Sequence, residues 1–367
     1  MADPTVRLET DYAIPPGETL LEFLEDRQMA QADLARRMHR PLKTINEIVK
    51  GKAAITPETA IQLERVLGMP ASFWNNREAN YREDLARIAE RKDLEGRVEW
   101  LRTFPLQDLI KHRLISDTAD KVLQLRELLR FLAVSSPDAW DAQQAVTSAL
   151  LRQSPIFAAS PDAVAVWLRW GELQASEIEC QPYDREQFLS ALTNVRPLTR
   201  DNPQVFVPEV QRLCAEAGVA VVFIPELPKT RASGAAKWLS PTKALIQLSL
   251  YGKSDDKLWF SFFHEAGHLL LHGRKLTFVH DENSKAENQF KDVKEEEADR
   301  FARDFLIPPA EYRRIAATHN TSTRIISNFA AEIGIAPGIV VGRLQHDGLV
   351  PMNYCNKLKQ PLRWVND

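Results

Sequence analysis

Apolar residues recur at helical spacing through most of the chain, and strand-like runs are confined to one stretch. Short helices are predicted throughout residues 18–75, and longer amphipathic helices follow as far as residue 200. Beyond residue 202, β-branched and alternating apolar runs predict three strands, at 219–224, 235–239 and 244–250. The pattern predicts a multidomain, mainly α chain, with an all-α N-terminal part, a helical middle and an α+β C-terminal part containing a small sheet.

The strand at 244–250 is our candidate for an exposed sheet edge. Its apolar positions alternate with a second set that includes polar residues: Ile246, Leu248 and Leu250 against Leu245, Gln247 and Ser249. An exposed edge pairs with an extended peptide through main-chain hydrogen bonds. We therefore expect a peptide to bind along this strand.

Residues 31–38 and 41–51 form two short helices separated by a tight break, a pattern typical of helix-turn-helix modules. Pro41 suits a first helical turn, and Gly51 suits a helix end. Thr56, followed by proline, predicts the capped start of the next helix.

Basic residues are concentrated in the same segment. Residues 31–52 carry six basic and two acidic side chains, a net charge of +4, whereas residues 18–75 as a whole carry eight of each. Positive charge gathered on one edge of a small domain suits contact with DNA phosphates. The alternative interpretation is a helical protein-interaction domain with a solvated basic face.

The strongest chemical signal is the segment His264-Glu265-Ala266-Gly267-His268, an H-E-x-x-H within an apolar stretch. Residues four apart lie on one face of a helix, so both imidazoles point toward one site. Two nitrogen ligands in this arrangement suit a tetrahedral zinc ion. Glu265 is placed to bind a water at the metal rather than the metal itself.

A second predicted helix supplies further donors. A catalytic zinc site keeps three protein ligands and one open position. Glu295 is our choice for the third ligand because it shares the inward face with Ala298 and Ala302, and Glu297, at the edge of that face, is the alternative. Asp299 is expected to accept the N–H of a liganding histidine. The competing interpretation is a solvated acidic first turn.

Four more side chains are candidates for lesser roles. His272 and His280 lie near the motif, where each is either an ordinary helix-end or loop histidine or a catalytic one. Tyr251 and Tyr312 are candidates for stabilising the oxyanion.

FFHEAGHLLLH followed by EEEADRFARDFLIPP resembles the ImmA/IrrE family of zinc metallopeptidases over roughly residues 200–310. The resemblance implies a zincin-like metallopeptidase domain. It also implies that Zn²⁺ is bound by His264, His268 and Glu295, and that Glu265 is the catalytic base. FLIP stands where LLMP is common in the family, a conservative departure.

The N-terminal segments QADLARRM, TINEIVKGKAAITPETAIQLERVLG and SFWNNREANY resemble the lambda-repressor-like helix-turn-helix of HigA-type antitoxins. That resemblance implies a recognition helix whose side chains face DNA bases, namely Lys43, Thr44 and Asn46. It further implies phosphate contacts by Arg36, Arg37 and Lys50.

Composition sets outer limits. The chain has 367 residues and a net charge of −3, so no general attraction to polyanions is expected. Its three cysteines are widely spaced and predict no disulfide framework. The N-terminus lacks the apolar core of a secretory signal, and no run approaches the ~18 apolar residues of a membrane span. We expect a cytoplasmic protein without membrane contact.

These patterns divide the chain into five segments: an N-terminal lead-in (1–17), a helix-turn-helix DNA-binding domain (18–76), a helical connecting region (77–200), a zinc metallopeptidase domain (201–310) and its C-terminal helical extension (311–367). A long helix is expected at 77–102, and helices at 328–341 and 342–348 are expected beneath the active site.

The predicted function is a sequence-specific transcriptional regulator joined to a zinc-dependent endopeptidase. We expect a homodimer on an inverted-repeat operator, in the protein's own promoter, because one small module buries too little surface for tight binding. The expected substrate is a partner repressor or a toxin, in antitoxin, stress or mobile-element regulation. The alternative is an antitoxin-type repressor whose zinc domain binds a partner or senses a signal without proteolysis.

Overall fold

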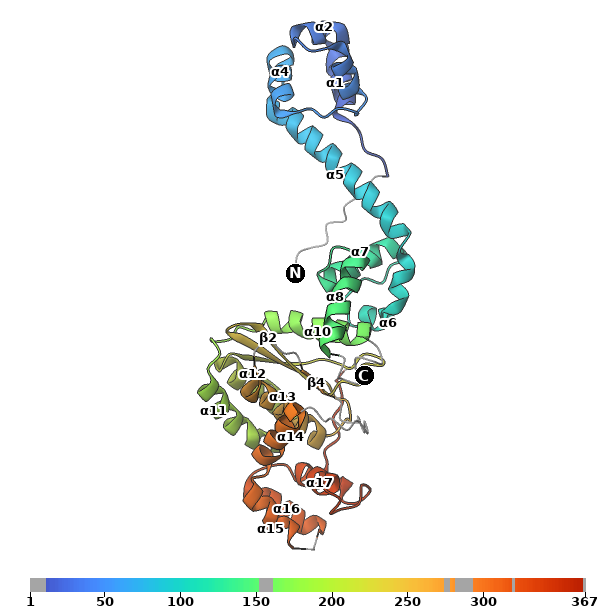
Figure 1. The fold of residues 1–367 in the computed structure, drawn as a ribbon. Helices are drawn as coiled ribbons and strands as arrows, with labels where there is room; N and C mark the ends of the chain where they lie inside the picture. The colour runs from blue at the N-terminus through green and yellow to red at the C-terminus, as the bar shows by residue number, and fades with distance from the viewer. Residues whose placement is uncertain (1–10, 152–160, 274–277, 281–292, 319–320, 366–367) are drawn as a thin grey trace. The chain divides into compact units, whose positions relative to one another are not determined.

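The computed structural model describes residues 11–151, 161–273, 278–280, 293–318 and 321–365 (Figure 1). It divides the chain into two compact units. The N-terminal unit comprises Met1–Glu99 with Thr118–Arg126, and the C-terminal unit comprises Trp100–Asp117 with Glu127–Asp367. Each unit has its own buried apolar cluster, so each is described by itself.

The helix signals of the N-terminal segment are confirmed. Thr56 accepts a hydrogen bond from the backbone N–H of Thr59 at 3.3 Å, and Gly68 ends that helix with a left-handed φ of 77°. Buried apolar side chains from each helix form one core. The helices are α1 (Pro16–Asp26), α2 (Gln31–Arg37), α3 (Leu42–Val49), α4 (Pro57–Leu67) and α5 (Ala71–Glu95).

The long connecting helix begins earlier than the predicted 77–102. Helix α5 starts at Ala71, because Trp74 in its first turns is fully buried in the N-terminal core. It therefore runs through the predicted domain boundary at residue 76 without interruption. It ends at Glu95 before Gly96, and a separate 3₁₀ turn follows at Val98–Thr103.

The connecting region is helical, as predicted. Its tryptophans are packing residues, since Trp167 and Trp170 are buried. The helices are α6 (Leu106–Lys111), α7 (Lys121–Leu132), α8 (Pro137–Leu151), α10 (Pro161–Ser176) and α11 (Arg185–Val195). Beyond residue 200, α12 (Pro203–Glu216) follows.

A four-stranded sheet lies at the centre of the C-terminal unit, with strand order β1-β3-β2-β4. The strands are β1 (Val219–Phe223), β2 (Gly234–Ser240), β3 (Lys243–Leu248) and β4 (Phe278–His280). β3 pairs parallel with β1 and antiparallel with β2, and β4 pairs antiparallel with β2. The three strands predicted from the sequence are confirmed within one or two residues at each end.

The prediction that 244–250 forms a sheet edge is wrong, because β3 is paired on both sides. The polar residues of its alternating pattern are buried and donate hydrogen bonds. Gln247 donates through Nε2 to the carbonyl oxygen of Trp167 at 2.7 Å, and Ser249 donates through Oγ to the carbonyl oxygen of Ala232 at 2.5 Å. Both are at most 2% exposed. The outer strands are β1 and β4.

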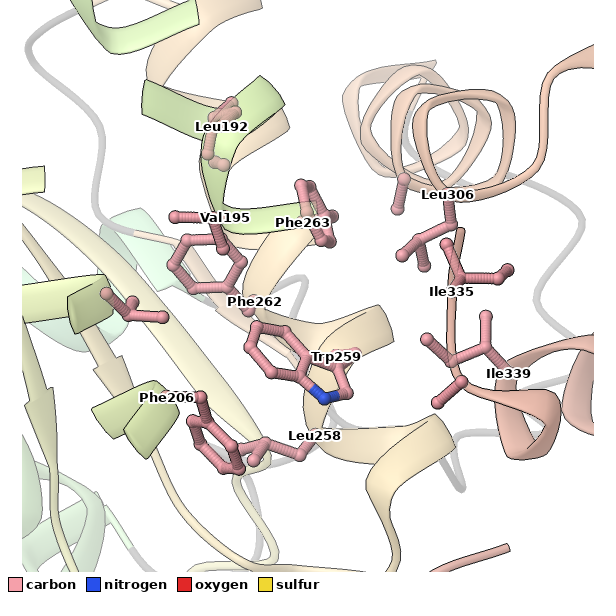
Figure 2. Close-up of a cluster of buried hydrophobic side chains, with 14 of the residues drawn as sticks. Leu192, Val195, Phe206, Leu258, Trp259, Phe262, Phe263, Leu306, Ile335 and Ile339 are labelled. Carbon is pink, nitrogen blue, oxygen red and sulfur yellow. The ribbon is translucent and has the colours of Figure 1, made fainter. Parts of the chain in front are cut away.

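Helices cover both faces of the sheet (Figure 1). α10 lies on one face, while α12 and α13 (Asp255–Leu271) lie on the other. The apolar core between α13 and its neighbours includes Leu258, Trp259, Phe262 and Phe263, which point toward side chains of α11, α12 and the C-terminal helices (Figure 2). Burying this much aromatic and aliphatic surface fixes α13 firmly in the unit.

The C-terminal helices differ from the predicted 328–341 and 342–348. The helices are α14 (Val293–Leu306), α15 (Pro309–Ala316), α16 (Thr323–Ile333) and α17 (Pro337–His346). Gly334, with a left-handed φ of 76°, ends α16, and Pro337 begins α17, so no helix runs through 328–341. As predicted, α17 packs against α13.

No single helix of the described segments is long and apolar enough to cross a membrane; α16 and α17 pass that test only as a pair, with a bend of 114° between them.

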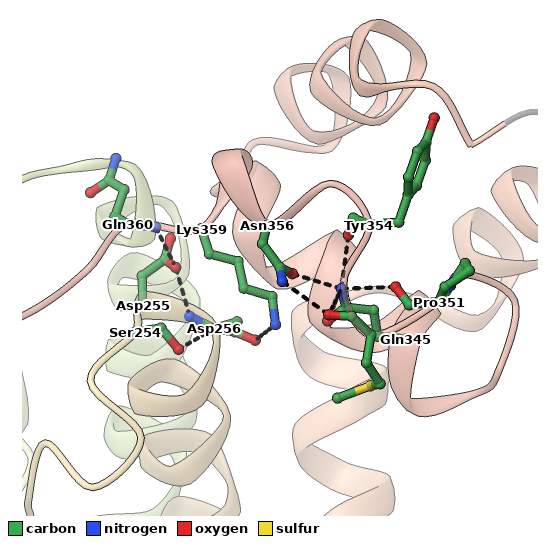
Figure 3. Close-up of polar contacts among 10 residues, drawn as sticks. Ser254, Asp255, Asp256, Gln345, Pro351, Tyr354, Asn356, Lys359 and Gln360 are labelled. Atoms are coloured by element: carbon green, nitrogen blue, oxygen red, sulfur yellow. Dashed lines mark hydrogen bonds and ion pairs between the residues drawn. The ribbon is translucent and has the colours of Figure 1, made fainter.

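The chain after α17 returns to the beginning of α13 (Figure 3). Asp255 and Gln360 exchange two hydrogen bonds, from each backbone N–H to the other's oxygen, at 3.0 and 2.9 Å. Lys359 Nζ lies 2.6 Å from Asp256 Oδ2. These contacts fasten the C-terminal segment to the first turn of the helix that carries the histidines.

Candidate metal centre

Two helices that pack closely assemble the site. α14 lies along α13, and its residues Ala298 and Ala302 are fully buried. A Cβ atom at Gly267 would lie 3.2 Å from the Cα of Ala298, so the glycine of H-E-x-x-H allows the close approach. This contact brings the acidic first turn of α14 to the histidines of α13.

The two histidines and one glutamate converge. The Nε2 atoms of His264 and His268 are 2.9 Å apart, and both rings are buried. The two carboxylate oxygens of Glu295 lie 3.2 Å from His264 Nε2 and 3.4 Å from His268 Nε2. The three potential ligand atoms all lie within 4.8 Å of one another, so the chain has a His-His-Glu cluster that can hold a metal ion.

Further side chains contact the Nδ1 atoms of the two histidines. Asp299 Oδ1 lies 3.0 Å from His264 Nδ1, as the sequence predicted. His268 Nδ1 faces Nδ1 of His272 at 2.9 Å, and His272 Nε2 lies 3.1 Å from Glu297 Oε2. Glu297, the alternative third ligand, therefore contacts His272 in this structure rather than the histidine pair.

The side chain of Glu265 lies beside the cluster. Its side chain is fully buried, and within the described part of the chain neither carboxylate oxygen is hydrogen-bonded. Gly234, the first residue of β2, leaves room for it, since a Cβ atom there would lie 2.8 Å from Glu265 Oε1. A buried carboxylate that binds no protein donor is available to a ligand.

Burial and mutual charge set the protonation of these groups. Burial raises the pKa of Glu265 to about 8, against the opposing effect of His264. Burial alone would lower the pKa of His264, but its hydrogen bonds to Asp299 and Glu295 outweigh this and raise the pKa to about 10. Burial lowers the pKa of His268 to about 4.

Glu295 is the anionic member of the cluster. Burial acts to raise its pKa, but its hydrogen bonds to His264 and His268 and their charges hold that pKa well below the usual range of a glutamate. The donor set therefore fits a divalent cation of borderline softness: two imidazole nitrogens and one carboxylate from two rigid helices.

The structure also places the two tyrosines and the backbone of His280. Tyr312 donates its hydroxyl hydrogen to Asp347, among the C-terminal helices. Tyr251 lies in the turn between β3 and α13. His280 is in β4, opposite Gly234 of β2, and its side chain lies outside the described part of the structure.

Side chains predicted to contact DNA lie at the surface of α2, α3 and the turn that follows. Arg36, Arg37, Lys43 and Lys50 are exposed, and Thr44 and Asn46 are half-buried. The opposite faces of the two helices are buried in the core through Leu34, Ala35, Ile45 and Ile48. Two of the charges have acidic neighbours on the same helix: Arg36 pairs with Asp33, and Lys43 lies 3.8 Å from Glu47.

Sequence reasoning missed two features of the site. One is the room that Gly234 leaves for the side chain of Glu265, and the other is the contact between His272 and Glu297. Gly234 is thirty-one positions before Glu265, and no local pattern connects them. His272 offered a signal, because it stands one helical turn after His268 and on the same face.

Family models match both parts of the chain. Residues 20–74 match a helix-turn-helix model, and residues 214–345 match a model described as the IrrE N-terminal-like domain. The second match spans the sheet, both helices of the His-His-Glu cluster, and the helices as far as α17.

Several known proteins are similar to the N-terminal part. The uncharacterized HTH-type transcriptional regulator YddM of Escherichia coli K12 is 36% identical over 61 residues, which are 17% of this chain and 65% of that protein. The chain thus spans slightly less than two thirds of that relative. Virulence-associated protein A of Dichelobacter nodosus is 31% identical over 97 residues, 26% of this chain and 91% of that protein.

Among solved structures, the antitoxin HigA of Pseudomonas aeruginosa with the higBA promoter is 35% identical, over 23% of this chain and 94% of that chain, with a TM-score of 0.22. The family follows from the sequence matches. The chain belongs to the helix-turn-helix family that includes virulence-associated protein A, and its residues 214–345 match the IrrE N-terminal-like domain.

Proposed function

We propose that this protein is a DNA-binding regulator whose C-terminal unit is a zinc-dependent endopeptidase. The observation that carries the peptidase half is the buried cluster itself. His264, His268 and Glu295 converge, and the carboxylate of Glu265 lies beside them with no hydrogen-bond donor among the residues that the structure describes. The set matches the two-histidine, one-glutamate ligand set of catalytic zinc sites.

His264 and His268 would hold the zinc ion through their Nε2 atoms, and Glu295 through its carboxylate. When bound, zinc supplies a Lewis acid that polarises a carbonyl and acidifies water. Glu265 takes a proton from the attacking water and passes it to the nitrogen of the leaving amine. A base whose pKa is near neutrality suits both transfers, and burial moves the pKa of Glu265 in that direction.

The N-terminal unit is proposed to bind an operator through α3. Its surface carries Lys43, Thr44 and Asn46, while the basic side chains of α2 and Lys50 flank it. Amide and amino groups at such positions read base edges, and arginines and lysines contact phosphates. The similarity to an HTH-type transcriptional regulator supports this assignment. We propose a homodimer on an inverted repeat.

The two halves together suggest regulation by cleavage. A regulator that binds its operator and also cuts a repressor or toxin changes transcription or toxicity when the peptidase acts. We propose a partner repressor or a toxin as the substrate, because the N-terminal sequence resembles that of HigA-type antitoxins.

Zinc analysis and mapping of new protein termini test the proposal. The purified wild-type chain should contain one zinc ion per chain by metal emission. Incubated with a lysate of its own organism, it should generate new N-termini that the zinc-loaded Glu265→Gln variant does not. Bound zinc without any difference between the two proteins would favour the non-proteolytic alternative. Absence of bound zinc would refute the metal site.

A further inference from the structure

His272 is the residue that follows α13, and its imidazole lies against the His-His-Glu cluster. Its backbone N–H still donates to the carbonyl oxygen of His268 at 3.1 Å, while its own φ and ψ are extended. The imidazole is 3% exposed. One ring nitrogen, Nδ1, lies 2.9 Å from Nδ1 of His268, and the other, Nε2, lies 3.1 Å from Glu297 Oε2.

We propose that His272 is a positioning residue: it joins His268 to Glu297 and thereby fixes the tautomer in which His268 binds the metal. The proposal rests on the zinc site proposed above. Nothing about the H-E-x-x-H pattern itself requires a third histidine, so this assignment concerns a feature of the chain beyond its ligand set.

The direction of the hydrogen bonds follows from counting protons. Two Nδ1 atoms at 2.9 Å need one proton between them. When Nε2 of His268 binds a metal, its proton must be on Nδ1, where it is donated to His272. A neutral His272 then carries its own proton on Nε2, facing the carboxylate of Glu297, which only accepts.

The opposite direction is unfavourable at both ends. If His272 donated through Nδ1, His268 would carry its proton on Nε2 and could not bind the metal there. Nε2 of His272 would then present a lone pair to the carboxylate of Glu297. Glu297 therefore selects the arrangement that leaves Nε2 of His268 open for the metal.

The two histidine ligands are thus supported in different ways. His264 contacts the carboxylate of Asp299 directly, whereas His268 reaches the carboxylate of Glu297 through a second imidazole. Asp299 and Glu297 both come from α14, so one helix orients both ligands from outside the metal site.

Zinc affinity, measured by competition with a chromophoric chelator, separates positioning from packing. His272→Phe keeps an aromatic ring but no acceptor, and should weaken zinc binding about ten- to a hundredfold. His272→Asn restores an acceptor oxygen near the position of Nδ1 and should recover most of the loss. Glu297→Ala should weaken binding on its own and add nothing to His272→Phe, because both act through one chain of hydrogen bonds.

The matched control is Glu296→Ala, which removes an exposed carboxylate from the same turn and should leave zinc affinity unchanged. Long-range ¹⁵N–¹H spectra of the zinc-loaded, histidine-labelled protein provide an independent measurement. They should show His272 protonated at Nε2 and unprotonated at Nδ1, and this preference should weaken in Glu297→Ala.

Equal losses in His272→Phe and His272→Asn, or wild-type affinity in His272→Phe, would overturn the positioning role. A His272 protonated at Nδ1 in the zinc-loaded protein would do the same. These results leave the zinc site itself intact. A wild-type chain that binds no zinc would instead refute the proposed metal site, and the role of His272 with it.

Discussion

Asp299 Oδ1 lies 3.0 Å from Nδ1 of His264, while Glu295 Oε2 lies 3.2 Å from Nε2 of the same ring. The two carboxylates are one helical turn apart on α14, so a single helix contacts both nitrogens of one buried imidazole. In the proposed zinc site, Asp299 would keep the ring in the tautomer whose Nε2 is free for the metal, and Glu295 would complete the donor set on that side.

Removing Asp299 should weaken the metal site without removing a ligand. Asp299→Ala is expected to lower zinc affinity about ten- to a hundredfold, because His264 loses the acceptor that fixes its tautomer. Asp299→Asn keeps a carbonyl oxygen as acceptor and should lose less. Chelator competition measures both variants. If Asp299→Ala binds zinc as tightly as wild type, the carboxylate has no orienting role.

Adding one methyl group at Gly234 should disturb Glu265 while sparing the ligands. A Cβ atom there would lie 2.8 Å from Glu265 Oε1, so Gly234→Ala forces the carboxylate to move. A displacement of about 1 Å at a reacting group lowers turnover by up to about a hundredfold. Zinc content should be unchanged, because the three atoms nearest to that Cβ all belong to Glu265 and none to His264, His268 or Glu295.

Gly273→Ala is the matched control, since a Cβ atom at that position meets no atom of the described residues within 4 Å. Both variants are compared with wild type by the rate at which the new N-termini appear and by metal emission. A Gly234→Ala protein that cleaves at the wild-type rate would show that the position of Glu265 is not limiting.

The His-His-Glu cluster could be predicted because its signals are local. Helical periodicity alone places His264 and His268 on one face, and the inward face of the second helix selects Glu295 over Glu297. The structure adds what depends on distant contacts. Glu265 has room only because strand β2 begins with Gly234, and sequence spacing carries no information about that contact.

The prediction of a sheet edge failed for the same physical reason. The candidate edge 244–250 is paired on both sides, and the polar residues of its alternating pattern, Gln247 and Ser249, donate to the carbonyl oxygens of Trp167 and Ala232. A buried polar side chain with a partner looks like a surface residue in the sequence. The break between α16 and α17 was missed because the apolar pattern continues across Gly334.

The DNA-binding half predicts two different effects on operator affinity. Asn46 lies on the surface of α3, where its amide is proposed to contact a base. Asn46→Ala should therefore weaken the free energy of operator binding by about 1–3 kcal/mol and relax the sequence preference. Lys50→Ala should weaken binding to all sequences and reduce the salt dependence by about one phosphate contact. Fluorescence anisotropy with the promoter fragment and with scrambled DNA, at several salt concentrations, measures both.

Lys92→Ala, which removes an exposed charge from α5, controls for general charge effects. Zinc content should stay at the wild-type level in all three variants. If Asn46→Ala lost equal affinity for promoter and scrambled DNA, Asn46 would have no role in base recognition.

The first turn of α13 contributes a pH dependence of stability. Burial, reinforced by the charge of Asp256, raises the pKa of Asp255 from 3.8 to about 6, although backbone N–H groups of Gln360 and Asp256 donate to it. The folded protein therefore binds this proton more tightly than the unfolded chain does. The contribution of Asp255 to the free energy of unfolding must fall as pH rises from about 4 to about 6, and stay constant above.

Asp255→Asn removes the charge and keeps a carbonyl oxygen that can accept from Gln360. Its stability relative to wild type should therefore increase between pH 4 and pH 7, by about 2–3 kcal/mol for a shift of this size. Denaturant unfolding at both pH values, followed by tryptophan fluorescence, measures the difference, and comparing the two proteins cancels the titration of all other groups. If the free energies of unfolding of variant and wild type changed in parallel with pH, the proton affinity of Asp255 would be the same in the folded and unfolded chain. A relative stability that decreases with pH would show that the charged carboxylate is stabilised here, because its hydrogen bonds to the C-terminal segment then outweigh the cost of burying it.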